Sequence, residues 1–229
     1  MRNHPARWFA TSAAILLAAC GGNGDPTPVT PPAYAADIAQ RHLLTGGGSW
    51  AMSGTGPTGQ AFTITMTFAP LLDAAFPISG AVASLSRQTF TLTQEGTTTD
   101  VGGPTFYFDK STLSIVGTDN GDGTCSVATS SAALPSSAAA GANGSLVTRS
   151  ELNFCASSAG SVGITTTRWS IETDAGIALL CWNSTVTDAI GSVIETDSRC
   201  VEIGTDGSLG RRARLTITVV GLTIAARNF

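Results

Sequence analysis

Residues 62–68 read Phe-Thr-Ile-Thr-Met-Thr-Phe, so apolar side chains alternate strictly with threonines. Successive side chains of a β-strand point to opposite faces, and this alternation is typical of a strand with one buried face and one wet face. The segment predicts that Phe62, Ile64, Met66 and Phe68 contribute to a core while the threonines face water.

Similar patterns recur along the chain, at residues 89–94, 105–108, 112–116, 146–154, 165–171, 177–182, 193–203 and 213–220. Asn-Gly and Asp-Gly dipeptides, which tolerate the positive φ of tight turns, stand at 120–121, 122–123, 143–144 and 206–207. We therefore expect an all-β domain of about ten antiparallel strands, either a single barrel or a sandwich, with the barrel favoured. One short helix is expected at 36–44, with Asp37 as a candidate N-cap.

Four cysteines lie in the strand-rich region, at 125, 155, 181 and 200. An even number in an exported chain favours two disulfides. A zinc site is the alternative, but the chain has no C-x-x-C spacing, and His42 is the only histidine after the first few residues.

The spacing of the cysteines predicts their pairing. A tight turn at Ile190-Gly191 would place Cys181 opposite Cys200 on one hairpin, and Trp182 opposite Arg199 as a cation–π pair. The midpoint of Cys125 and Cys155 falls in an Ala/Ser-rich loop at 130–144, so these two are expected to pair across its base. We predict the disulfides Cys125–Cys155 and Cys181–Cys200.

The N-terminus has the features of an export signal. Arg2 and Arg7 precede an apolar run of about twelve residues, which is shorter than the roughly 20 that a spanning helix requires. The run ends in Leu17-Ala18-Ala19-Cys20, which resembles the lipobox of bacterial lipoproteins. An ordinary signal peptide with a chance cysteine is the alternative.

The lipoprotein resemblance implies cleavage after Ala19, lipidation of the Cys20 sulfur and acylation of the new amine, for example with palmitate. Gly21, rather than aspartate, follows the cysteine, which implies the outer membrane, with the domain in the periplasm or on the cell surface. Three domains are expected: a signal peptide at 1–19, the lipidated cysteine with a Pro/Gly-rich tether at 20–35, and an all-β domain at 36–229.

The charge balance argues against nucleic-acid binding. The chain carries 12 basic and 16 acidic residues, and two of the basic residues leave with residues 1–19. Lys110 is the single lysine, whereas a protein that binds nucleic acid must neutralise phosphates with basic side chains.

Two short motifs suggest binding sites. Asn120 and Asp122 stand at alternate positions, as oxygen ligands do in calcium loops, but a hairpin turn explains them equally well and we expect no metal. Gly48-Ser49-Trp50 resembles the G-x-W motif of lipocalins. That resemblance implies a Trp at the barrel floor covered by an arginine, here Arg212 or Arg214, although the second lipocalin signature is absent.

Catalytic motifs are poorly represented. A Ser-His-Asp site would depend on His42 alone, and no G-x-S-x-G occurs. A pair of carboxylates stays open, because their distance is a property of the fold. Phe229 ends the chain as in outer-membrane barrels, but the residues before it lack the alternating apolar pattern of those proteins.

The composite prediction is an outer-membrane-anchored, non-enzymatic lipoprotein without a cofactor, which contacts another envelope or surface component. The alternative is a lipocalin-like module that binds a small apolar ligand. The first predicts a packed core, and the second an open cavity of a few hundred Å³.

Overall fold

The computed structural model describes residues 31–229. The predictions for residues 1–30, including lipidation of Cys20, lie outside the described residues. The elements in chain order are β1 (Ala33–Tyr34), α1 (Ala36–Arg41), the π-helical turn η1 (His42–Gly46), β2 (Gly48–Thr55), β3 (Ala61–Ala75), β4 (Val82–Gln94), β5 (Thr97–Gly102), β6 (Thr105–Phe108), β7 (Ile115–Asp119), β8 (Cys125–Ser131), β9 (Ala138–Ala139), β10 (Asn143–Leu152), β11 (Ser161–Asp174), β12 (Ile177–Asp188), β13 (Val193–Ile203), β14 (Leu209–Val219) and β15 (Leu222–Arg227).

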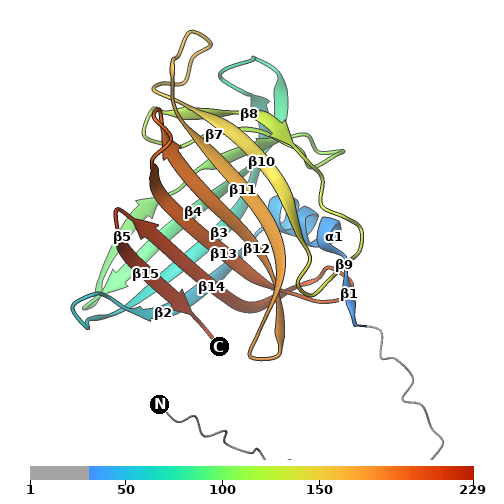
Figure 1. Ribbon diagram of the computed structural model, residues 1–229, viewed down its shortest axis with the longest axis vertical. Coiled ribbons are helices and arrows are strands. Elements are labelled where there is room, and N and C mark those ends of the chain that lie inside the picture. Colours follow the sequence, from blue (N-terminus) through green and yellow to red (C-terminus); the bar gives the residue numbers. More distant parts are fainter. Residues whose placement is uncertain (1–30) are drawn as a thin grey trace, which may run out of the picture. The chain divides into compact units, whose positions relative to one another are not determined.

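Within residues 31–229, twelve strands form a closed antiparallel barrel (Figure 1). Their order around the ring is β3-β2-β15-β14-β13-β12-β11-β10-β8-β7-β6-β4, and β3 pairs with β4 to close it. β5 is an additional strand that pairs with the second half of β4. Closure removes the unpaired edges that would otherwise attract other chains. The predicted all-β barrel is confirmed, with somewhat more strands than expected.

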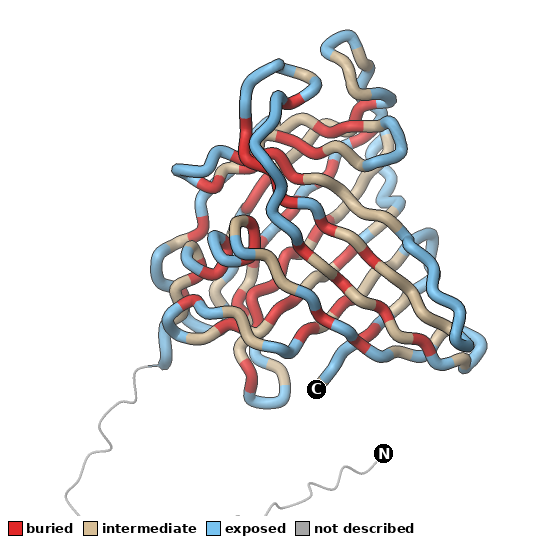
Figure 2. Tube along the Cα trace, turned by 180° about the vertical axis from the view of Figure 1, so that it is seen from behind, coloured by how far each residue is buried: buried red, intermediate tan, exposed pale blue. Residues whose placement is uncertain are grey.

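The barrel forms where the alternation predicts it. Phe62, Ile64, Met66 and Phe68 are buried inside β3, and the threonines between them are only partly covered. Buried and more exposed positions alternate along the neighbouring strands as well (Figure 2). Each large apolar side chain stabilises the fold by about 1.5–3 kcal/mol when it leaves water, so the inward row of every strand contributes to closure.

Two local predictions were wrong. The strand predicted at 112–116 does not begin at Thr112, because Leu113 has φ 60° and ends a turn in which Asp109 accepts hydrogen bonds from the backbone N–H groups of Ser111 and Thr112. β7 therefore begins at Ile115. Asn143-Gly144 is not a turn but the start of β10, where a Cβ on Gly144 would lie 2.8 Å from Nε1 of Trp169.

One end of the barrel, here called the helix end, is closed by α1 and η1. Leu43 and Leu44 are buried in the same core cluster as inward residues of the strands. Asp37 is not the N-cap: Ala35 occupies that position and makes no capping side-chain hydrogen bond. No helix within residues 31–229 has the length and hydropathy needed to cross a bilayer. The opposite end, here called the free end, carries the turns at 189–192 and 220–221.

Both predicted disulfides are present, Cys125–Cys155 with a Cα–Cα distance of 4.9 Å and Cys181–Cys200 with 4.0 Å. Cys181 and Cys200 are direct partners across β12 and β13, as the midpoint argument predicts. Trp182 also pairs with Arg199 in this register. The predicted cation–π contact between them is wrong, because the Arg199 guanidinium lies instead over Phe90, 5.7 Å from the ring centroid.

Removal of the first disulfide is expected to weaken the barrel. The Cys125→Ser, Cys155→Ser double variant should lose about 3–4 kcal/mol of unfolding free energy, because the crosslink closes a loop with a sequence separation of 30. Urea unfolding under non-reducing conditions measures this loss. The matched Cys181→Ser, Cys200→Ser variant opens a shorter loop and should lose slightly less unfolding free energy. If the variant without Cys125 and Cys155 is as stable as the native protein, the expectation is contradicted.

Candidate functional site

The inward side chains change from apolar to polar toward the free end. One row of register partners across β11, β12 and β13 is Trp169, Trp182 and Arg199. The next row toward the free end is Thr167, Ser184 and Asp197. The row after that runs across four strands and contains Arg149, Thr165, Val186 and Glu195. The barrel interior therefore has a packed apolar half and a polar half.

Aromatic rings separate the two halves. Trp182 packs edge-on against Phe68 and Phe106, with centroid distances of 5.9 and 5.6 Å. Phe68 and Phe106 stack on each other at 6.3 Å. Edge-to-face and stacked pairs at these distances add to the stability gained from burial. These rings form a rigid floor under the polar half.

Arg199 spans the lumen above this floor. Its Nη1 donates to Oε1 of Gln88 on β4 at 2.6 Å, and its Nη2 donates to Oδ2 of Asp197 at 2.9 Å. Its Nε lies 2.8 Å from Oδ1 of Asp197, without the alignment of a hydrogen bond. The Asp197 side chain is only 2% exposed, so this is a desolvated ion pair. A buried ion pair depends on good hydrogen-bond geometry, and removal of one partner is strongly destabilising because it leaves the other charge buried without compensation.

Arg149 lies on β10, three strands along the ring from Arg199, and its guanidinium has fewer polar partners. Its guanidinium stands over Phe106, 6.0 Å from the ring centroid, and its Nε is 4.0 Å from the nearest Glu151 oxygen. That Nε has no hydrogen-bond partner within residues 31–229, although the side chain is only 11% exposed. Burial lowers the pKa of Arg149 to about 10. A charged donor in this state is unusual, because buried polar groups normally have partners.

These side chains line a pocket of about 350 Å³ at the free end. Its walls are formed by Val101, Gly103, Pro104, Asn120, Arg149, Glu151, Thr165, Val186, Glu195, Asp197 and Arg199. A much smaller space of about 10 Å³ lies beneath it, between Arg149, Arg199 and the aromatic floor. The pocket thus gathers two guanidinium groups and three carboxyl groups from β10 and β13.

The pKa of the Glu195 carboxyl is raised above its usual value, chiefly by burial and next by the negative charge of Asp197. The folded protein therefore binds this proton more tightly than the unfolded chain does. Glu195 favours the folded state at low pH, and this contribution is lost as the pH rises through the raised pKa.

The Glu195→Gln variant is expected to remove this part of the pH dependence. The difference in unfolding free energy between about pH 4 and about pH 8 should change relative to the native protein, with the variant gaining at the higher pH. Urea unfolding across that range measures it, and Glu202→Gln on the outer side of β13 is the matched control. Superimposable pH profiles for the native protein and Glu195→Gln would contradict the assignment.

The calcium candidates lie in the turn between β7 and β8. Asp122 accepts hydrogen bonds from the backbone N–H and the hydroxyl of Thr124, and the Asn120 oxygen accepts one from Thr118. Turn formation accounts for both side chains. Asn120 also reaches the wall of the pocket.

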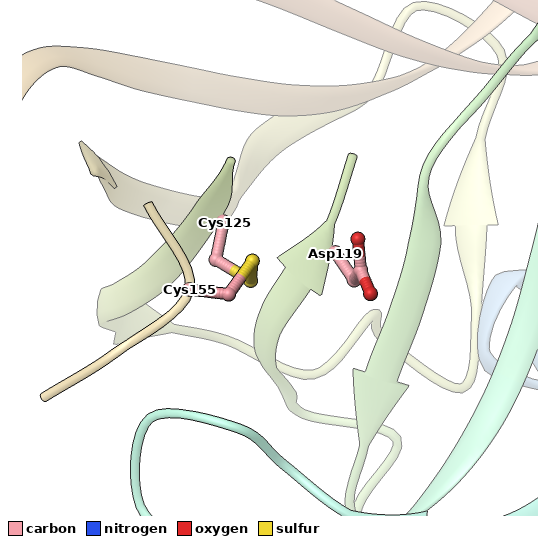
Figure 3. Close-up of side chains that lie close together, drawn as sticks. All are labelled: Asp119, Cys125 and Cys155. Atoms are coloured by element: carbon pink, nitrogen blue, oxygen red, sulfur yellow. A yellow bond between two sulfur atoms is a disulfide. The ribbon is translucent and has the colours of Figure 1, made fainter. Parts of the chain in front are cut away.

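Two other groups of metal-ligand residue types are explained by disulfides. Asp119 lies close to Cys125 and Cys155, as Figure 3 shows, and Glu172 lies close to Cys181 and Cys200. In both groups the sulfurs are bonded to each other, so no thiolate is available to bind a metal.

The lipocalin-like motif lies at the helix end. Trp50 is buried, and its Nε1 donates to the backbone oxygen of Gly210 at 2.9 Å. The expected arginine cover is wrong: Ala213 and Leu215 of β14 face the lumen, so Arg212 and Arg214 point outward. Arg214 binds Glu172 and Asp174 on the outer surface. The ring of twelve strands also differs from the eight of lipocalins.

His42 lies at the helix end, where its Nδ1 is 3.1 Å from the backbone oxygen of Gly207. It is therefore remote from the pocket in the free end. The carboxyl groups that the sequence left unplaced do converge, since Glu151, Glu195 and Asp197 line the same pocket.

The pocket residues carry a signal that the sequence analysis missed. Charges stand at alternate positions in Arg149-Ser150-Glu151 and in Glu195-Thr196-Asp197-Ser198-Arg199. In a strand such residues share one face, and a run of charges on a face expected to be buried marks a polar interior.

Comparison with protein-family models, curated proteins and solved structures found no match for the chain. The function is therefore inferred from the pocket and from the sequence of the leader.

Proposed function

We propose that this protein is a lipid-anchored envelope protein of the bacterial outer membrane whose barrel binds a small polar ligand without transforming it. The observation that carries the binding function is the pocket of about 350 Å³, in which Arg149 is buried with an unpartnered Nε. Ligand pockets typically span about 300–1,000 Å³, so this one suits a metabolite-sized molecule.

The polarity of the lumen selects against an apolar ligand. Core side chains and the helix fill the apolar half of the described barrel. The space at the free end is lined by five charged side chains together with Asn120, Thr165 and a few aliphatic groups. An apolar molecule there would leave the polar groups without partners at a cost of about 1–3 kcal/mol each. The ligand class is therefore polar rather than the apolar one that the lipocalin resemblance implies.

Ligand binding is expected to stabilise the full-length protein. At a ligand concentration about 100 times Kd, the gain is about 2.7 kcal/mol, which corresponds to a rise in Tm of about 5–10 °C for a chain of this size. Thermal unfolding with a panel of amino acids, sugars, dicarboxylates and diamines measures it. Tryptophan fluorescence reports independently, because one of the emitting indoles, that of Trp182, lies directly beneath the pocket. A panel without any shift by either readout would contradict the proposal.

The anchor is supported by the lipobox, by the tether and by the even cysteine number beyond them. Cys20→Ser in the full-length chain should move the protein from the membrane fraction to the soluble fraction, since about 0.8 kcal/mol of membrane affinity per buried methylene is lost. Fractionation with immunoblotting measures this. Ser12→Ala, in the same leader, is the matched control and should stay in the membrane. If Cys20→Ser sediments like the control, the protein is not lipid-anchored.

One observation favours hydrolysis as a second candidate function. Glu151 and Glu195 line one pocket, and the raised pKa of Glu195 is the property of a general acid. Incubation of the native protein and Glu195→Gln with p-nitrophenyl glycosides tests it. Turnover by the native protein that Glu195→Gln lacks would favour the hydrolase over simple binding.

A further inference from the structure

The pocket presents charged groups on β10 and β13 that make no hydrogen bond within residues 31–229, although Arg149 and Glu151 on β10 form a long ion pair of 4.0 Å. Arg149 makes no hydrogen bond within residues 31–229, and its Nε is buried. Glu151 and Glu195 line the same pocket and accept no hydrogen bond from a side chain or backbone group of that region. By contrast, Asp197 and Arg199 are bound to each other. The charged side chains of the pocket that make no hydrogen bond within residues 31–229 are therefore one cation and two carboxyl groups.

The charge balance limits what can bind beside Arg149. The pocket holds two arginines and three acidic residues, so a simple anion would approach Arg149 against a surplus of acidic groups. A simple cation would approach Glu151 and Glu195 beside a buried guanidinium. Like charges at close range are destabilising, and both single-charge ligands face this cost. A ligand with one group of each sign satisfies both sides.

A neutral sugar is a weaker match. Ligand pockets are lined predominantly by hydrophobic and aromatic side chains, and an exposed aromatic face would be needed to cover the apolar face of a sugar ring. The rings nearest the pocket are already covered: Arg149 lies over Phe106 and Arg199 lies over Phe90. The walls above them consist of aliphatic and charged side chains.

We propose that the pocket binds a small zwitterion, whose anionic group pairs with Arg149 and whose cationic group lies between Glu151 and Glu195. This inference rests on the proposed binding function and names its ligand class. Arg149 and Glu195 share one row of the barrel and are separated by two intervening strands, about 14 Å along the wall. Glu151 is two residues from Arg149 on the same strand, about 7 Å away.

The test uses a homologous series of ω-amino acids with the native full-length protein: glycine, β-alanine, γ-aminobutyrate, δ-aminovalerate and ε-aminocaproate. Butyrate and butylamine are the single-charge controls, and glucose is the neutral one. Calorimetric titration should show that at least one zwitterion binds about tenfold or more tighter than both single-charge controls, the effect of one charged hydrogen bond.

Substitutions then assign the two ends. Arg149→Met should weaken the best zwitterion about tenfold or more without weakening butylamine, which loses a like charge nearby. Glu195→Gln should weaken the zwitterion without weakening butyrate, for the same reason. Arg168→Met is the matched control, because Arg168 is exposed on β11 and binds Asn143 outside the pocket. Circular dichroism checks that each variant is folded. If a variant does not fold, the ligand series with the native protein still tests the proposal.

The outcomes separate the two proposals. If butyrate, butylamine or glucose binds as tightly as the zwitterions, the ligand class is wrong while a binding pocket remains. If no probe of any charge binds, and the broader panel also fails to shift the Tm, both the zwitterion and the binding function are overturned.

Discussion

Asp197→Ala is expected to lower the unfolding free energy by about 3–5 kcal/mol. The Asp197 carboxylate is almost fully buried and is bound to Arg199, which in turn reaches Gln88 on the far side of the lumen. Without Asp197, the guanidinium stays in the barrel with its charge uncompensated, and that desolvation cost dominates. Urea unfolding followed by Trp fluorescence measures the loss.

A double variant separates this cause from a loss of packing. Asp197→Leu combined with Arg199→Met removes both charges and keeps similar volumes, so it should recover most of the lost stability. Arg212→Met on the outer surface is expected to change stability by less than about 0.5 kcal/mol. If Asp197→Ala is no less stable than the Arg212 control, the ion pair does not brace the barrel.

Phe106→Ala is expected to lower the unfolding free energy by about 3–5 kcal/mol as well. Phe106 is 2% exposed, packs against Phe68 and Trp182, and supports the Arg149 guanidinium. Its removal leaves a cavity that the surrounding rings fill only partly, which adds to the lost transfer free energy. The same change should join the small space beneath Arg149 to the pocket above.

Two measurements check this expectation. Urea unfolding gives the free energy, and quenching of tryptophan fluorescence by acrylamide should increase as the floor that contains Trp182 opens. Phe106→Leu keeps most of the volume and should cost less than about 1.5 kcal/mol. Equal stability of Phe106→Ala and Phe106→Leu would show that the ring is not a structural part of the floor.

Much of the fold follows from local pattern. The alternation at 62–68 and in the later runs predicts the strands, because the side-chain period of a strand is two residues. The pairing of Cys181 with Cys200 follows from a tight turn midway between them, and the structure has that turn at 189–192. Pattern failed at Thr112 because of a local turn at Asp109, and at Gly144 because the neighbouring Trp169, 25 positions away, packs against it.

The pocket was out of reach of the same reasoning. Arg149 and Glu195 line the same pocket only because β10, β11, β12 and β13 pair in a register that places both residues in one row of the barrel. Arg199 bonds to Gln88, which is 111 positions away, because closure of the ring brings β4 across the lumen from β13. The sequence shows that charged residues share one face of a strand, but it does not show which side chains of other strands they contact.

The sequence by itself determined the class of fold, the register of the β12–β13 hairpin and the pairing of cysteines, since each depends on periodicity and turn geometry within a few tens of residues. Only the tertiary structure decided that twelve strands close, that α1 and η1 fill one end, and that the free end holds a charged pocket. These features depend on contacts between segments far apart in the chain, and the free energy of such contacts is set by burial and charge in three dimensions.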